Sequence, residues 1–129
     1  MEVFPLIWSD DVARLCTGAH ECLGLAESWR AEGDDGRVEH AELVWPGGKI
    51  SLNERRPEFT SIGPSGIGLR MDDQDMVANT HARAVRAGAS ITQALAESPV
   101  AYSFTATDPD GNQWWVHAET GFLDELRTN

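Results

Sequence analysis

Basic residues are scarce in this 129-residue chain: Lys and Arg number 10 against 21 Asp and Glu, and the formal net charge is −11. A polyanion is repelled by such a surface, so we expect neither nucleic acid nor an anionic membrane as a partner. A cationic ligand would be attracted, although the same charge also serves solubility alone.

Cysteines and long apolar runs are also lacking. Cys16 and Cys22 are the only cysteines, and in a helix they would project from different faces and could not bridge each other. No run approaches the roughly 18 apolar residues of a membrane helix. The first residues show neither the basic nor the apolar region of a signal peptide. We therefore expect one compact cytoplasmic domain.

What the chain does contain is an internal repeat. Acidic pairs begin at residues 10 and 72, glycines that end helical patterns stand at 24 and 88, and Pro-x-Gly turns begin at 46 and 109. The spacing of these three landmarks stays between 62 and 64 residues. Acidic side chains cap helix N-termini and glycine suits the residue just past a helix end, so each copy predicts one helix.

The apolar positions support this interpretation. The first helix carries a stripe at Val12, Leu15, Cys16, Ala19 and Leu23, and the second at Val77, Thr80, His81, Ala84, Val85 and Gly88. One strand precedes each helix and about three follow it. The expected strands are Glu2–Trp8, Glu27–Arg30, Val38–Val44 and Lys49–Asn53, then Gly66–Met71, Ile91–Leu95, Tyr102–Thr107 and Gln113–His117.

The predicted fold is therefore α+β, with two tandem βαβββ units that form curled mixed sheets around a cleft and carry their helices on the outer faces. Unit one spans about 1–54, a linker 55–65, unit two 66–118 and a tail 119–129. The tail is expected to form a short closing helix on which Phe122, Leu123 and Leu126 pack inward. Function is expected in the cleft.

Several of these segments resemble the vicinal oxygen chelate superfamily, which includes glyoxalases, extradiol dioxygenases and bleomycin-resistance proteins. They are Asp11-Val12-Ala13, Gly24, His40-Ala41-Glu42-Leu43, Asp72-Asp73-Gln74-Asp75 and Thr107-Asp108-Pro109-Asp110-Gly111-Asn112. The resemblance extends from about Val3 to His117. It implies the same fold but not one activity, because this fold supports many chemistries.

In the metalloenzymes of that superfamily, His, Gln or Glu residues on the first and last strands of each unit hold a divalent ion. If the ligand positions of the family are transferred to this chain, they fall on Phe4 and Gly66 on the first strands and on Trp115 on the last strand of unit two. The counterpart of Trp115 in unit one is then Leu52. None of these side chains is a metal ligand. We therefore expect no metal and no other cofactor at the family position.

Side chains alternate along a strand, so these positions also predict which residues face the cleft. On the first strands, Val3, Pro5 and Ile7 should face the helix in unit one, and Ile67, Leu69 and Met71 in unit two. The predicted ligand-binding residues are Phe4, Leu6, Trp8, His40, Glu42, Leu52, Gly66, Gly68, Arg70, Ser103, Trp115 and His117, with Glu54 at the cleft mouth. Tryptophan faces opposite a glycine floor predict a flat or bulky organic ligand, and the carboxylates favour a cationic group.

Three functions remain open on these residues. The first is a metal-free binding protein, similar to the bleomycin-resistance branch, that sequesters an aromatic or cationic antibiotic-like molecule; the resemblance also implies a homodimer. The second is a lyase, isomerase or dioxygenase-like enzyme. It would use a displaced metal site at His40, Glu42, Glu54 and His117, or His40 and Glu42 as an acid–base pair. The third is a paralogue that pairs with another protein. The sequence favours binding over catalysis.

Overall fold

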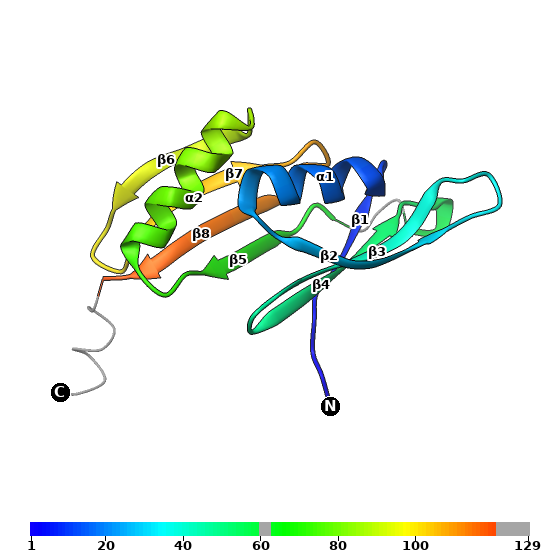
Figure 1. Cartoon of the computed structure of the whole chain (residues 1–129), viewed down its shortest axis with the longest axis horizontal. Coiled ribbons are helices and arrows are strands. Elements are labelled where there is room, and N and C mark those ends of the chain that lie inside the picture. Colours follow the sequence, from blue (N-terminus) through cyan, green and yellow to red (C-terminus); the bar gives the residue numbers. More distant parts are fainter. Residues whose placement is uncertain (60–62, 121–129) are drawn as a thin grey trace.

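A computed structural model, which describes residues 1–59 and 63–120, places two similar α+β units side by side (Figure 1). Unit one contains β1 Leu6–Ser9, α1 Val12–Leu23, β2 Ala26–Glu32, β3 Val38–Trp45 and β4 Gly48–Glu54. A short 3-10 helix, η1 Pro57–Phe59, follows. Unit two contains β5 Gly66–Arg70, α2 Gln74–Arg86, β6 Ser90–Glu97, β7 Ala101–Thr107 and β8 Gln113–Glu119. The predicted βαβββ repeat is confirmed. The expected closing helix lies outside the described residues.

Both helices begin and end as their sequences predict. The carboxylate of Asp11 accepts a hydrogen bond from the Arg14 amide at 3.1 Å, and that of Asp73 from the Met76 amide at 2.8 Å. Gly24 ends α1 with a left-handed φ of 74°, a conformation that glycine adopts without strain. Within the described residues, no helix is both long and apolar enough to cross a membrane.

The stripe of α1 is buried throughout, whereas that of α2 is less regular. Val77 and Ala84 are fully buried, but the expectation for Val85 is wrong because 53% of its surface is exposed. The ring of His81 meets Phe104 of β7 edge-on, with centroids 5.0 Å apart. His81 therefore belongs to the packing of unit two.

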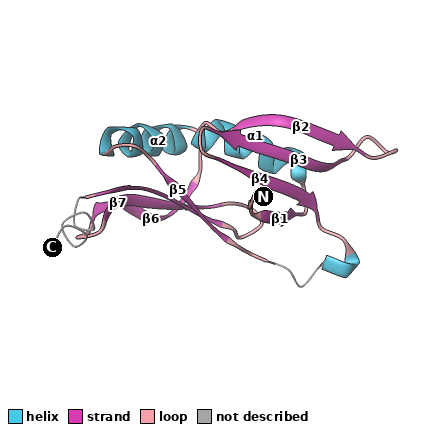
Figure 2. Ribbon diagram, turned by 90° about the horizontal axis from the view of Figure 1, so that it is seen from below, coloured by secondary structure: helices cyan, strands magenta, loops and turns pink. Residues whose placement is uncertain are grey.

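Each unit folds its strands into a separate four-stranded sheet. The order is β1-β4-β3-β2 in the first sheet, sheet A, and β5-β8-β7-β6 in the second, sheet B. The first and last strands of each unit pair in parallel, and the other neighbours are antiparallel. In Figure 2 the strands of unit two lie in a layer beneath α2.

One face of each sheet packs against its helix and the other is open. Ile7, Ala41, Leu43, Ile50 and Leu52 are buried beneath α1, and Ile67, Leu69, Phe104, Trp114 and Val116 beneath α2. The expectation that Val3 and Pro5 share the face of Ile7 is wrong. β1 begins only at Leu6, and Val3 is 90% exposed.

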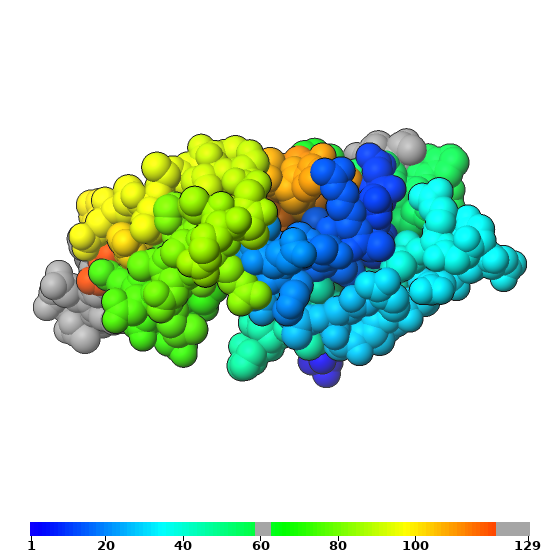
Figure 3. Space-filling view, turned by 45° about the horizontal axis from the view of Figure 1, so that its top comes forward, coloured from blue at the N-terminus to red at the C-terminus, as the bar shows by residue number. Residues whose placement is uncertain are grey.

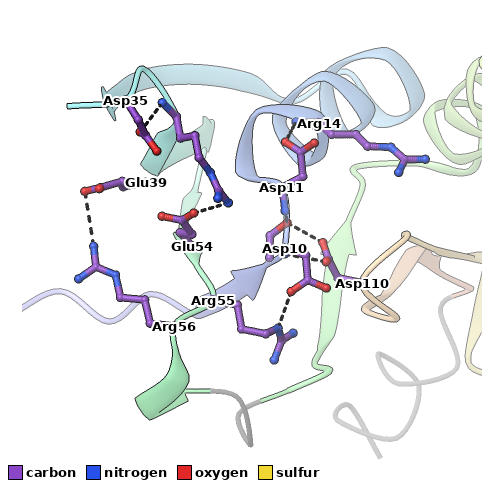
Figure 4. A network of polar contacts seen from close by, with 11 residues as sticks. Asp10, Asp11, Arg14, Asp35, Glu39, Glu54, Arg55, Arg56 and Asp110 are labelled. Atoms are coloured by element: carbon purple, nitrogen blue, oxygen red, sulfur yellow. Dashed lines mark hydrogen bonds and ion pairs between the residues drawn. The ribbon is translucent and has the colours of Figure 1, made fainter. Parts of the chain in front are cut away.

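The two units are joined by helix packing and by polar contacts at both ends of α1. α1 packs against α2, whereas no strand of one sheet packs extensively against a strand of the other. At the N-terminal end, the Ser9 hydroxyl donates to the Asp110 carboxylate at 2.7 Å, and the Asp10 amide donates to the same carboxylate at 3.0 Å (Figure 4). At the C-terminal end, the Arg83 guanidinium donates to the carbonyls of His20 and Glu21 at 2.9 and 3.0 Å.

Candidate functional site

The open face of sheet A carries two cross-strand rows of side chains. The pairing register sets Trp8 beside Asn53, Asn53 beside His40 and His40 beside Ala31. In the same way, Leu6, Ser51, Glu42 and Trp29 form the next row. Partners in register project from the same side of a sheet, so these residues share one surface. Leu6, Trp8, His40 and Glu42 therefore lie on the face predicted from the sequence.

The polar groups of this face bind one another. His40 Nδ1 lies 3.0 Å from Asn53 Oδ1, which fixes the orientation of the imidazole ring. The carboxylate of Glu42 accepts a hydrogen bond from Ser28 at 3.1 Å and lies 3.5 Å from the ammonium group of Lys49. That ammonium group also sits 4.4 Å from the ring centroid of Phe4, so Phe4 lies at the edge of this surface rather than in a strand.

The prediction that the Leu52 side chain faces the ligand is wrong. Leu52 is fully buried on the helix face of β4, and its neighbours Ser51 and Asn53 occupy the open face. The 63-residue offset of the turns does not hold in the last strand. Leu6 pairs with Ser51 as Gly68 pairs with Trp115, so Ser51 is the counterpart of Trp115 at an offset of 64. A shift of one residue in a strand turns every side chain to the other face.

The open face of sheet B is built around an aromatic stack. The rings of Trp115 and His117 lie nearly parallel, with centroids 3.7 Å apart and an interplanar angle of 15°. Gly68 pairs with Trp115 on the adjacent strand, and a Cβ atom placed on Gly68 would lie 3.8–3.9 Å from both rings. The glycine therefore leaves a shallow floor beside the stack, and Gly66 extends it toward the start of the strand.

Polar side chains border this stack. Arg70 pairs in register with His117, and its guanidinium binds the Glu119 carboxylate at 3.2 Å. Ser103 pairs with His117 from β7, and the Thr105 hydroxyl donates to the amide oxygen of Gln93 at 3.0 Å. Arg70, Ser103, Trp115 and His117 therefore share the face that the alternation predicts.

The predicted site is divided between two surfaces within one chain. Leu6, Trp8, His40 and Glu42 belong to sheet A, with Phe4 at its edge, whereas Gly66, Gly68, Arg70, Ser103, Trp115 and His117 belong to sheet B. Glu54, which is labelled in Figure 4, forms an ion pair with Arg37. Sequence reasoning missed Ser51 and Asn53, although the apolar alternation of Ile50 and Leu52 within the strand indicates them.

The positions at which the resemblance predicts metal ligands hold Phe4, Gly66, Trp115 and, by the observed register, Ser51. These side chains do not form a donor set for a divalent ion, because they provide no imidazole, carboxylate or thiolate. Elsewhere in residues 1–59 and 63–120, no three His, Cys, Asp or Glu side chains lie close enough together to hold a metal ion.

Neither of the two cysteines has the properties of a reactive thiol. Both are free thiols. Burial, with a smaller contribution from the Glu27 carboxylate, raises the pKa of Cys16 to about 11. Burial and the Glu21 carboxylate raise the pKa of Cys22 as well. Neither thiol is activated as a nucleophile.

Several solved structures share this architecture. TioX from Micromonospora sp. ML1 is 20% identical, with a TM-score of 0.75 over 92% of this chain and 99% of its own. Protein ATC0852 from Agrobacterium tumefaciens is 22% identical, with a TM-score of 0.73 over 94% and 100%. A lactoylglutathione lyase from the same organism is 16% identical, with a TM-score of 0.71 over 95% of both chains. At these identities the likeness concerns the fold alone.

A comparison with curated protein sequences finds no match. The model of one family, however, matches nearly the whole chain, from residue 5 to residue 116, and this range covers both βαβββ units up to the middle of β8. This protein therefore belongs to the Glyoxalase/Bleomycin resistance protein/Dioxygenase superfamily.

Proposed function

We propose that this protein binds a flat aromatic or cationic organic molecule on the open faces of its sheets and sequesters it without transforming it. The observation that carries the proposal is the stack of Trp115 on His117 beside the bare backbone of Gly68. An aromatic platform next to a missing side chain can accept a planar ring system, and stacking on tryptophan supplies affinity.

The charges of the two faces favour a cationic group on this ligand. Glu42 lies on the open face of sheet A and Glu119 on that of sheet B, where Lys49 and Arg70 pair with them, so an organic cation would compete with these two side chains. The chain as a whole carries a net charge of −11, which favours such a cation. A carboxylate beside an aromatic ring holds an organic cation by both ion pairing and cation–π attraction.

A second copy of the chain completes the site in this proposal. In one chain the open faces leave large apolar side chains in water: Trp29 is 49% exposed, Leu6 48% and Trp115 38%. A two-fold pairing that lays sheet A of one chain over sheet B of the other would cover these side chains and enclose the ligand between them. The proposed assembly is therefore a homodimer with its ligand between the chains.

Given the chemistry of the site, an antibiotic-like molecule is the ligand class we propose to test. A set of cationic and aromatic antibiotics is added to the protein, and thermal shift and tryptophan fluorescence are recorded. At least one class should raise the melting temperature and quench fluorescence, because a ligand that binds only the folded state stabilises it. A complete lack of response would overturn the proposal.

Variants of Trp115 locate the binding. Trp115→Ala should weaken it by about tenfold or more, whereas Trp115→Phe keeps a ring and should retain most of the affinity. Val100→Ala is the matched control, because Val100 is a 40% exposed apolar residue in the turn between β6 and β7. Equal affinities in Trp115→Ala and Val100→Ala would contradict a site on this face.

One arrangement favours an enzyme as the second candidate. His40 and Glu42 lie on the same face of β3, and the contact with Asn53 orients the His40 ring as an acid–base residue requires. Elemental analysis of protein purified without chelator tests the version with a displaced metal. Stoichiometric zinc, nickel, iron or manganese would replace our proposal with this one.

A further inference from the structure

We infer a second binding site, for an uncharged apolar organic molecule, in a pocket between helix α1 of unit one and sheet B of unit two. The pocket has a volume of about 560 Å³, within the range of sites that hold small organic ligands. One wall is the face of α1 that contains Gly18 and Cys22, and the other is formed by β7, the start of β6 and Trp114. In Figure 3, α1 (blue) lies beside the orange end of β7 and the yellow-green segment after α2, which border this pocket.

The pocket exists because both walls are made of small residues. They are Gly18, Ala19 and Cys22 on α1, and Gly88, Ala89 and Ala106 on unit two. Gly18 is the most informative of these small residues. It stands inside α1, where glycine is the least favourable residue after proline, and a Cβ atom there would meet nothing within 4 Å. Neither backbone conformation nor close packing requires glycine at this position, and its effect is to leave the pocket open.

The polar contacts between the units fix the position of one wall relative to the other. Asp110 binds Ser9 and the Asp10 amide at the N-terminal end of α1, and Arg83 binds the carbonyls at its C-terminal end. The pocket lies along the helix between these two attachments. It is therefore already formed before any ligand enters, which lowers the free energy cost of binding.

Several polar groups in the walls are already satisfied by the protein. The hydroxyls of Thr92 and Thr107 bind each other at 2.8 Å, and the Thr17 hydroxyl donates to a carbonyl of its own helix at 3.1 Å. The Asp108 carboxylate accepts the indole N–H of Trp114 at 2.8 Å. A ligand gains little from hydrogen-bonding groups here and gains chiefly from apolar area.

Charge at the rim disfavours ions of either sign. Arg14 and Glu21 line the pocket from opposite ends of α1 and are exposed, so an anion or a cation would be attracted at one end and repelled at the other. The third charged side chain of the lining, Asp108, already accepts hydrogen bonds from the Asn112 amide and the Trp114 indole. Burial keeps Cys22 a neutral thiol. The ligand that fits is therefore neutral, unlike the cationic molecule proposed for the open faces.

The neutral dye N-phenyl-1-naphthylamine tests this site, because its fluorescence rises in apolar surroundings. The dye should bind the wild-type protein saturably. Gly18→Leu projects a side chain into the pocket and should weaken binding by about tenfold, which corresponds to about 1.4 kcal/mol. Ala82→Leu is the control, because Ala82 is an exposed residue of α2 outside the pocket lining, and it should leave the affinity unchanged.

Two further measurements separate this site from the open faces and from a folding defect. Trp115→Ala should leave dye binding unchanged; if it abolishes binding while Gly18→Leu does not, the dye lies on sheet B and the inference is wrong. In the wild-type protein, the dye should slow alkylation of Cys22 by N-ethylmaleimide by about fivefold at saturation, measured by peptide mass spectrometry. Unprotected Cys22 would overturn the inference even if Gly18→Leu fails to fold.

Discussion

The hydroxyl of Ser9 donates a 2.7 Å hydrogen bond to the carboxylate of Asp110, which lies 101 positions later in the sequence. The same hydroxyl accepts a hydrogen bond from the backbone amide of Asp11, the capping residue of α1. Ser9 is completely buried. The turn motif that supports the resemblance to the superfamily is thus also a structural link between the repeats, and its Asp110 helps to complete the N-terminal end of α1.

Removal of this link should destabilise the fold. Asp110→Ala leaves the Ser9 hydroxyl without its acceptor in a buried position, and the expected loss is about 1–3 kcal/mol in the free energy of unfolding, measured by urea denaturation. Asp72→Ala is the control, since Asp72 is exposed and the described residues include no side-chain partner for it. Equal stability of the two variants would show that the link contributes nothing.

The glycines that follow the two helices allow a comparison between equivalent positions. Gly24 and Gly88 both have positive φ, 74° and 81°, so alanine strains the backbone at either site, by about 1 kcal/mol or more. Only at Gly24 would the new Cβ meet another group, Nη1 of Arg83 at 3.2 Å. Gly24→Ala should therefore lower the free energy of unfolding more than Gly88→Ala. Equal losses would mean that the guanidinium moves away at no cost, and a larger loss in Gly88→Ala would contradict the prediction.

Ionisation of Cys16 should make stability fall in alkaline solution. Its thiol has an ordinary pKa of 9.0, which burial raises to about 11 in the folded chain. Between these values the unfolded chain releases a proton that the folded chain retains, so the free energy of unfolding decreases as pH rises from about 9 to about 11. Cys16→Ala lacks this thiol and should lose less stability over the same interval. Parallel curves for the two proteins, from urea denaturation at each pH, would contradict this assignment.

Gly68 should limit ligand size without limiting stability. A Cβ atom at this position makes ordinary contacts of 3.8–3.9 Å with His117 and Trp115, so Gly68→Ala should change the free energy of unfolding by less than about 1 kcal/mol. A larger side chain, as in Gly68→Leu, would cover the floor beside the stack and weaken binding of a flat ligand. Titration of a ligand found in the antibiotic screen measures this, with Gly68→Ala as the folded control.

Alternation of apolar and other residues predicted much of this fold, because one face of each sheet is buried. In β5, for example, Ile67 and Leu69 are buried, whereas Gly66 and Gly68, which alternate with them, are exposed. The error at Leu52 came from transferring one offset to a strand whose register differs by a single residue. The contacts of Asp110 and Arg83 with unit one could not be predicted, because they join side chains and backbone groups far apart in sequence. For the same reason, the division of the site between two sheets could not be read from the repeat.

The attachments of α1 have a consequence for the history of the duplication. At equivalent positions, unit one has Gly47 where unit two has the clamping Asp110, and Glu21 where unit two has Arg83. In each attachment, therefore, the second copy provides the side chain and the helix of the first copy receives it. The two copies are no longer interchangeable, and a chain built from two copies of the first unit would lack the groups that complete both ends of its own helix.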